Sequence, residues 1–139
     1  MSKTKEILIC CAIFLIPAII AFPLREKAKS YKKVISPYQR TIDQLKGIDV
    51  LWIDARKEKK FRMRNIPGSI NISQYNWEKG MEALFMAFEK FDPEGTLVVY
   101  CNVGCHDSEA VATRLRDELG NDKVYFLKGG INAWFDAQQ

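Results

Sequence analysis

The feature that most constrains the fold is a short apolar run that ends at a cysteine and leads into a helical pattern. Thr96 to Tyr100 is rich in β-branched and aromatic residues and too short for a surface helix, so we predict a strand buried on both faces. From Asp107 or Ser108, apolar residues recur at helical spacing, and Gly120 stands where a helix C-terminus needs a positive φ. Cys101 is therefore expected at the carboxyl end of a strand, facing a helix N-terminus across a short loop.

That position has a chemical consequence for the thiol. Amides of the loop and of the first helical turn have no partners within the helix, and they present partial positive charge to whatever lies between them. A thiolate is stabilised in such a place, and the thiolate is the nucleophilic form of cysteine. Gly104 fits a loop that turns its amides inward. The alternative is that Cys101 is a small core residue at the end of a strand.

The remaining pattern predicts strands that alternate with helices. Further strands are expected at Val50–Ile53, Ile70–Ile72 and Val124–Leu127, and a helix with a core face at Trp77, Met81, Leu84, Phe85 and Phe88. A short terminal helix carries Trp134. Such alternation predicts an α/β fold with a parallel sheet. Ligands of these sheets bind beyond the carboxyl ends of strands, where Cys101 is expected.

A further helix is predicted to start at Ser36. Serine is a good N-cap, Pro37 suits the first helical position, and Gln39 stands where a capping box needs it. Tyr38, Ile42 and Leu45 would line its apolar face, and Gly47 would end it. We place the start of the globular domain just before this helix, so that the domain comprises residues 34–139.

The sequence of the N-terminal segment predicts contact with a membrane. Residues 7–24 form an 18-residue stretch without a charge, which as a helix would span roughly 27 Å. We interpret residues 1–24 as a transmembrane anchor formed by an N-terminal hydrophobic helix, or else as a signal peptide cleaved after residue 21. Residues 25–33 would be a basic linker. The count of flanking charges favours a cytoplasmic domain, whereas a signal peptide would export it.

The net charge of +4 does not indicate a nucleic-acid-binding domain. Residues 1–33 carry 7 Lys and Arg against 2 acidic residues, and residues 34–139 carry 14 against 15. The basic excess therefore belongs to the N-terminal segment.

A basic run from Arg56 to Arg64 follows the Val50–Ile53 strand. Such a run is usually a solvated helix or loop, here with Phe61 turned inward. In a parallel sheet it would leave the same edge as Cys101, and its charge would draw anions toward the thiol.

Two groups of residues resemble the signatures of the rhodanese-like domain. The first is Asp54-Ala55-Arg56 with Phe61 and Asn65-Ile66-Pro67-Gly68-Ser69, and the second is Tyr100-Cys101 through Gly104 together with Leu127, Gly129, Gly130 and Trp134. The resemblance covers about residues 34–139. It implies a three-layer α/β/α fold with a five-stranded parallel sheet, and sulfurtransferase chemistry in which a cysteine holds sulfane sulfur as a persulfide.

Carried onto this chain, the resemblance makes Cys101 the nucleophile and sulfur carrier. The amides of Asn102, Val103, Gly104, Cys105, His106 and Asp107 would form the substrate-binding loop, with Asp54 and Arg56 in support. A persulfide held by loop amides is an anion stabilised by fixed dipoles. No cofactor and no metal is expected. The partners would be a small sulfur donor (persulfide, polysulfide or thiosulfate) and a thiol acceptor, without nucleic acid.

The chain departs from the family pattern in three places. Arg64-Asn65 replaces the usual Gly-His, and His106-Asp107 stands where many active members carry a cation. Since an acidic rim should weaken capture of thiosulfate, a persulfide is the expected donor. The loop is also one residue longer than the common form, as in related phosphatases, but Asp107 occupies the place of their anion-binding Arg, so we do not expect phosphatase activity.

Cys105 is the unusual residue of the loop. It can act as a resolving thiol that attacks a persulfide or sulfenate on Cys101 and closes a disulfide, or it can point into the core. His106 can be an exposed loop residue or a general base. A zinc site of Cys101, Cys105 and His106 would lack a fourth ligand. The alternative to an enzyme is a non-catalytic interaction or redox and sulfide-sensing module that uses Cys101 and Cys105.

Overall fold

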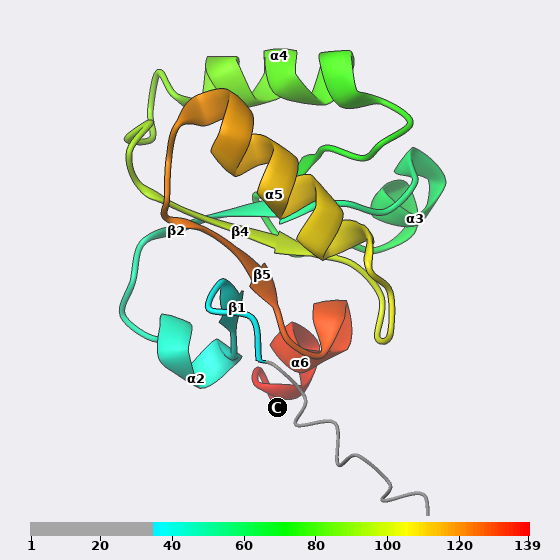
Figure 1. Ribbon diagram of the computed structural model, residues 1–139. Coiled ribbons are helices and arrows are strands. Elements are labelled where there is room, and N and C mark those ends of the chain that lie inside the picture. Colours follow the sequence, from blue (N-terminus) through cyan, green and yellow to red (C-terminus); the bar gives the residue numbers. More distant parts are fainter. Residues whose placement is uncertain (1–34) are drawn as a thin grey trace, which may run out of the picture. The chain divides into compact units, whose positions relative to one another are not determined.

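The structure is a computed structural model that describes residues 35–139 (Figure 1). Its centre is a five-stranded sheet in the order β1-β5-β4-β2-β3, and every neighbouring pair is parallel. The strands are β1 (Gln39–Arg40), β2 (Val50–Asp54), β3 (Ile70–Asn71), β4 (Thr96–Tyr100) and β5 (Val124–Leu127). This confirms the predicted five-stranded parallel sheet.

Helices cover both faces of this sheet. They are α2 (Ile42–Leu45), α3 (Glu58–Met63), α4 (Trp77–Ala87), α5 (Asp107–Leu119) and α6 (Gly130–Asp136). In Figure 1, α4 and α5 lie on one side of the strands, and α2 and α6 lie on the other. Two separate hydrophobic clusters fill the two interfaces, so the described residues form three layers.

The central strand β4 supplies both clusters because its side chains alternate between the faces of the sheet. Leu97, Val99 and then Cys101 pack toward α4 and α5. Val98 and Tyr100 pack toward α2 and α6. All five are almost fully buried. Since both faces of β4 are covered, the uniformly apolar sequence from Thr96 to Tyr100 is explained.

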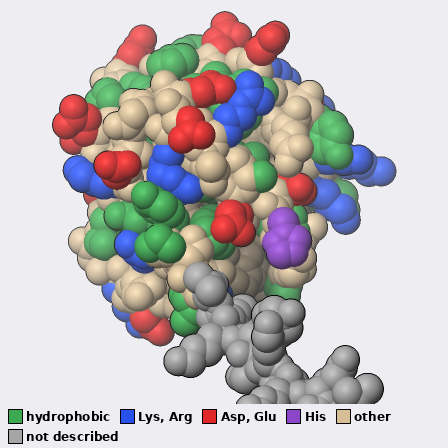
Figure 2. Space-filling model, viewed as in Figure 1, with side chains coloured by type: hydrophobic (Ala, Val, Ile, Leu, Met, Phe, Trp, Pro, Cys, Tyr) green, Lys and Arg blue, Asp and Glu red, His purple; other side chains and the backbone are tan. Residues whose placement is uncertain are grey.

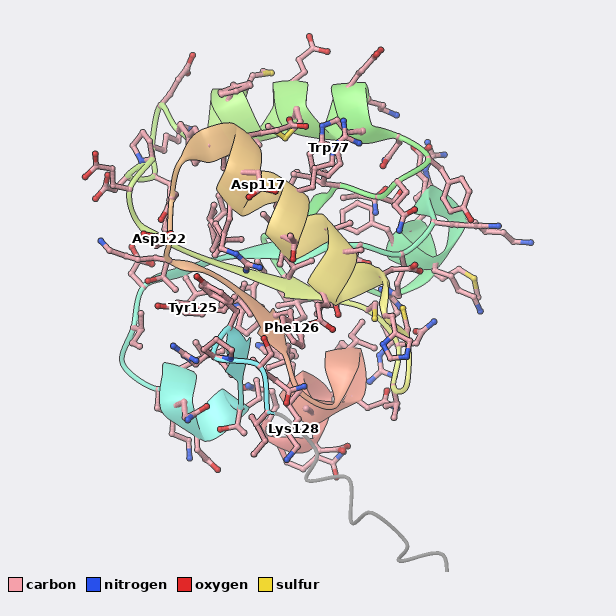
Figure 3. The ribbon with its side chains drawn as sticks, in the orientation of Figure 1. Trp77, Asp117, Asp122, Tyr125, Phe126 and Lys128 are labelled. Carbon is pink, nitrogen blue, oxygen red and sulfur yellow. The ribbon has the colours of Figure 1, made fainter. Side chains whose placement is uncertain are left out.

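Side-chain contacts hold α4 and α5 together on their face of the sheet. The indole Nε1 of Trp77 donates a 3.1 Å hydrogen bond to Glu118 Oε2, and the guanidinium of Arg114 lies 3.9 Å from the ring centroid of Trp77. Figure 3 shows Trp77 at the start of α4, above α5. These contacts hold α5, and with it the loop that precedes it, against the rest of the domain.

The prediction that a helix starts at Ser36 is wrong, although Ile42 and Leu45 do lie in a helix, α2, which begins at Ile42. Residues 36–39 form a turn, closed by a 3.1 Å hydrogen bond from the amide of Gln39 to the carbonyl of Ser36. The end of this turn and the residue after it pair with β5. The backbone amides of Phe126 and Lys128 donate hydrogen bonds to the carbonyls of Tyr38 and Arg40. Partners far along the chain thus outweigh the local helix-start signals. The capping box exists further on, between Thr41 and Gln44 at the start of α2.

The other helices follow the sequence pattern with one exception. α5 ends at Gly120, which has φ +64° as predicted. In α4, Trp77, Met81 and Leu84 are buried as predicted, but Phe85 is 57% exposed. It lies at the border of the apolar stripe and makes an edge contact with the ring of Phe88.

The predictions for residues 1–24 and 25–33 lie outside the described residues. Among residues 35–139, no helix has the length and apolar character needed to cross a membrane.

Candidate functional site

Cys101 lies directly after β4, between the N-terminal ends of α5 and α6. Its backbone is held from two sides: the amide of Ala55 donates to the carbonyl of Tyr100 at 2.9 Å, and the amide of Ile131 donates to the carbonyl of Cys101 at 2.8 Å. At Gly130, where φ is +61°, a Cβ would overlap the carbonyl oxygen of Cys101. Glycine is therefore required at the start of α6, and the sulfur-bearing residue is placed by a segment almost 30 residues away in sequence.

The sulfur of Cys101 is enclosed, with the residue only 2% exposed. Sγ lies 3.3 Å from the carbonyl oxygen of Asn102, 3.3 Å from that of Cys105, and 3.4 Å from the hydroxyl of Ser108. Carbonyl oxygens accept a hydrogen bond from a thiol and repel a thiolate. These contacts therefore suit the neutral thiol, and the expected ring of amides around the sulfur does not describe this conformation.

The loop after Cys101 nevertheless offers donors. It turns through a 3.3 Å hydrogen bond from the amide of Cys105 to the carbonyl of Asn102, and Gly104 supplies the positive φ (+75°) that this turn needs. Within residues 35–139, the amides of Val103 and Gly104 donate to no protein acceptor. Both residues are exposed. Two backbone donors of the loop are therefore available to an anionic ligand.

Cys105 lies half-buried beside Cys101, and both pack against the hydrophobic cluster under α5. Its Sγ is 3.4 Å from Asp107 Oδ2 and accepts from the Asp107 amide at 3.4 Å. Burial, followed by the adjacent Cys101 thiol, raises the pKa of Cys105 to about 12. We predicted that Cys105 either points into the core or serves as a reactive thiol of the loop. Its side chain in fact contacts both the core and Asp107.

His106 and Asp107 form the exposed rim of the site at the start of α5. His106 takes the N-cap position but makes no side-chain capping hydrogen bond. Figure 2 shows the only histidine of the chain at the surface. Asp107 carries a negative charge in the first turn of α5, where the helix dipole stabilises it.

Asp54 and Arg56 lie in the adjacent strand end but do not contact the sulfur. The guanidinium of Arg56 binds the Asp54 carboxylate through Nε at 2.9 Å and Nη2 at 2.6 Å, and Nη2 also donates to the carbonyl of Arg64 at 2.6 Å. Asp54 is fully buried and Arg56 is 8% exposed. Burial opposes the charge of Arg56, but Asp54 outweighs it, so the net direction of the Arg56 pKa is upward.

This pair changes the expected role of the basic run. The parallel pairing of β2 and β4 does bring Arg56 to the same sheet edge as Cys101, as the sequence predicts. Its charge, however, is used to hold the α3 segment, and Arg62 pairs with Glu58. Neither therefore offers its charge freely to offset Asp107.

The sequence pattern missed Ser108 and Tyr100 as parts of the site. Ser108 is 4% exposed and contacts the sulfur, and its only signal was its place in the first turn of the predicted helix. The hydroxyl of Tyr100 accepts from the amide of Ile66 at 3.1 Å and hydrogen-bonds Ser69 at 3.0 Å. It thereby fixes the 65–69 turn beside the strand that ends at Cys101. Within the described part of the chain, no group of three or more His, Cys, Asp or Glu side chains is placed to hold a metal ion.

Solved structures share this fold. The BH2092 protein from Bacillus halodurans superimposes with a TM-score of 0.55 at 22% identity, over 73% of each chain. The single domain sulfurtransferase RDL2 of Saccharomyces cerevisiae superimposes with a TM-score of 0.53 at 20% identity, over 75% of this chain and 93% of that one. At these identities the likeness concerns the fold alone.

Sequence comparison finds curated relatives that are named sulfurtransferases. The adenylyltransferase and sulfurtransferase UBA4 of Debaryomyces hansenii is 28% identical over 122 residues, which cover 85% of this chain and 25% of that protein. Its namesake in Sclerotinia sclerotiorum is 32% identical over 92 residues, 60% of this chain and 20% of that protein. The chain thus spans about a quarter or less of these relatives.

The sequence model of the rhodanese-like domain matches residues 38–137. This range contains all five strands, the Cys101 loop and the whole of α6. The chain belongs to the rhodanese-like domain family.

Proposed function

We propose that this protein is a sulfurtransferase in which Cys101 carries sulfane sulfur as a persulfide. The observation that supports this most directly is the place of Cys101, at the end of a central strand and at the start of a loop in which the amides of Val103 and Gly104 have no protein acceptor within the described residues. The similarity to the UBA4 proteins, which are named sulfurtransferases, agrees with it.

The reaction has two steps. In the first, the Cys101 thiol loses its proton and the thiolate attacks the sulfane sulfur of the donor. A bond forms between Sγ and that sulfur, and the remainder of the donor leaves with the electron pair of the broken bond and takes up a proton. In the second, an acceptor thiol attacks the outer sulfur, and the Cys101 thiolate leaves. The Ser108 hydroxyl, 3.4 Å from Sγ, can donate to the thiolate in both steps.

The charges of the rim select the donor. Asp107 is exposed next to the loop, and the charge of Arg56, which would otherwise offset that of Asp107, is buried in its pair with Asp54. A doubly charged donor such as thiosulfate is repelled more strongly than a singly charged persulfide. We therefore propose a small persulfide or a protein-bound persulfide as the donor, and a thiol as the acceptor.

The test is sulfur transfer by the full-length chain from several donors to cyanide or to a dithiol. The Cys101→Ser variant is the control because it keeps the size of the side chain and removes the nucleophile. We expect transfer above the control with at least one persulfide or polysulfide donor. A rate equal to that of Cys101→Ser with every donor contradicts the proposal.

That negative result would favour a non-catalytic module instead. The observation behind this second candidate is the enclosed sulfur of Cys101, beneath a loop whose Val103 is 63% exposed and suits contact with a partner. Such a module would bind through the loop or register oxidation of Cys101 and Cys105 without turnover.

We also propose that residues 7–24 tether the domain to a membrane, on the grounds of their length and lack of charge. Full-length protein should then stay in the membrane fraction after alkaline carbonate washing and keep its first 21 residues. A soluble product that begins near residue 22 would instead identify a cleaved signal peptide. Protease treatment of intact and broken vesicles would report which side carries the domain.

A further inference from the structure

The two cysteines of the described chain, Cys101 and Cys105, are both free thiols. They are brought together by the turn in which the Cys105 amide donates to the carbonyl of Asn102 and Gly104 adopts φ +75°. As a result the Cys101 sulfur lies 3.3 Å from the carbonyl oxygen of Cys105. Both side chains pack against the same hydrophobic cluster.

With its raised pKa the Cys105 thiol is protonated at rest, and two groups of Asp107 lie against its sulfur. Asp107 Oδ2 lies 3.4 Å from Sγ and can accept the proton, and the Asp107 amide, also 3.4 Å away, can stabilise the thiolate that results. Sulfur transfer through Cys101 to an external acceptor uses neither group.

We propose that Cys105 resolves the Cys101 persulfide by attacking Sγ of Cys101, so that the protein releases sulfide when no acceptor thiol arrives. This rests on the proposed function, because it requires sulfane sulfur on Cys101. Cys105 acts here as an internal acceptor that competes with the external one.

The step balances without an outside oxidant. Cys105 passes its proton to Asp107, a bond forms between the two Sγ atoms, and the bond between Cys101 Sγ and the outer sulfur breaks. Asp107 passes the proton on to the outer sulfur, which leaves with that electron pair as hydrosulfide. The sulfane sulfur is thereby reduced, and the two cysteines are oxidised to a disulfide. An external dithiol reduces the disulfide and restores both thiols.

The raised pKa of Cys105 sets the pace of this reaction. A thiol whose pKa is about 12 is almost entirely protonated at neutral pH, so the attack is slow compared with transfer to a well-placed acceptor. The persulfide therefore lasts long enough to be used, and sulfide is released from molecules that find no acceptor.

The experiment loads the full-length chain with inorganic polysulfide without oxygen, removes the excess, and follows hydrosulfide release with no acceptor present. Mass spectrometry of peptides locates the remaining sulfur. In the wild type we expect about one hydrosulfide per persulfide, together with a Cys101–Cys105 disulfide. In Cys105→Ser we expect release at least tenfold slower, with the persulfide kept on Cys101.

The matched control is the Cys10→Ser, Cys11→Ser double variant, which removes the other two thiols and should release sulfide at the wild-type rate. Equal persulfide lifetimes in the wild type and Cys105→Ser overturn the proposal, as does extra sulfur located on Cys105. Peptide mapping of the wild type decides the matter even where Cys105→Ser does not fold, since absence of the Cys101–Cys105 linkage after release is also contrary. If Cys101 takes up no sulfur even in folded Cys105→Ser, the proposed function itself fails.

Discussion

Gly130, the first residue of α6, lies against the carbonyl group of Cys101. A Cβ at this position would overlap the Cys101 oxygen and lie 2.8 Å from the carbonyl carbon of Asn102. The next amide along, that of Ile131, donates a 2.8 Å hydrogen bond to the same oxygen. The backbone at the start of α6 therefore packs directly against Cys101 and Asn102, the first residues of the loop.

Gly130→Ala should displace this loop and reduce sulfur transfer by at least tenfold, because the new methyl group meets backbone atoms. The matched variant is Gly104→Ala, which has the same kind of positive φ (+75°) but nothing within 4 Å of the new Cβ. It should lose only about 1–2 kcal/mol of stability from the left-handed conformation. Transfer assays and urea unfolding would compare the two. Equal losses of activity in both would mean that backbone conformation, and not contact with Cys101, makes Gly130 necessary.

Arg56→Met should lower the free energy of unfolding by about 3–5 kcal/mol, since it leaves the buried Asp54 carboxylate without its partner. Urea unfolding measures the change. Arg62→Met provides the comparison because its pair with Glu58 is exposed, and its midpoint should stay at the wild-type value. If the two variants are equally stable, the pair of Asp54 and Arg56 does not hold the α3 segment in place.

Tyr100 gives the domain a dependence on alkaline pH. Burial is the main cause that raises its pKa from 10.0 to about 12. Between these values the unfolded chain has lost the phenolic proton and the folded chain keeps it, so stability is full below about pH 10 and falls as pH rises toward 12.

Tyr100→Phe should remove this fall and, at neutral pH, cost about 1–3 kcal/mol because the Ile66 amide loses its acceptor. Unfolding curves from pH 8 to 11 would show both effects. Since Cys105 also has a raised pKa, both proteins should carry Cys105→Ser. An alkaline fall of the same size with and without the Tyr100 hydroxyl would assign it to another group.

Asp107→Asn should raise kcat/KM for thiosulfate several-fold, and Asp107→Arg roughly tenfold or more, because each reduces the repulsion of a dianion at the loop. A singly charged persulfide donor should respond less. The assay needs saturating acceptor, so that transfer outruns the step in which Asp107 takes the Cys105 proton. Rates for thiosulfate that do not change with the charge at this position would remove Asp107 from donor selection.

The differences between expectation and structure share one physical cause, which is contact with residues that are distant in sequence. β1 is two residues long and has no apolar alternation, so only pairing with β5 makes Gln39–Arg40 a strand. Phe85 has the spacing of a core residue, but it lies at the edge of the α4 stripe, and whether such a residue is covered depends on its neighbours in space. In the same way, no local pattern predicts that the guanidinium of Arg56 hydrogen-bonds Asp54 and the carbonyl of Arg64.

The sequence by itself determined which segments become the central strands and main helices, and it placed Cys101 at a strand end before a helix. Those properties depend on hydrophobic period and on glycine at helix ends, which act over a few residues. Tertiary structure alone decided what surrounds the sulfur: the carbonyls of Asn102 and Cys105, the hydroxyl of Ser108, and the backbone of Gly130 beneath. These groups meet because parallel strands and their helices bring distant segments to one sheet edge, and short-range patterns do not encode the orientation of polar atoms there.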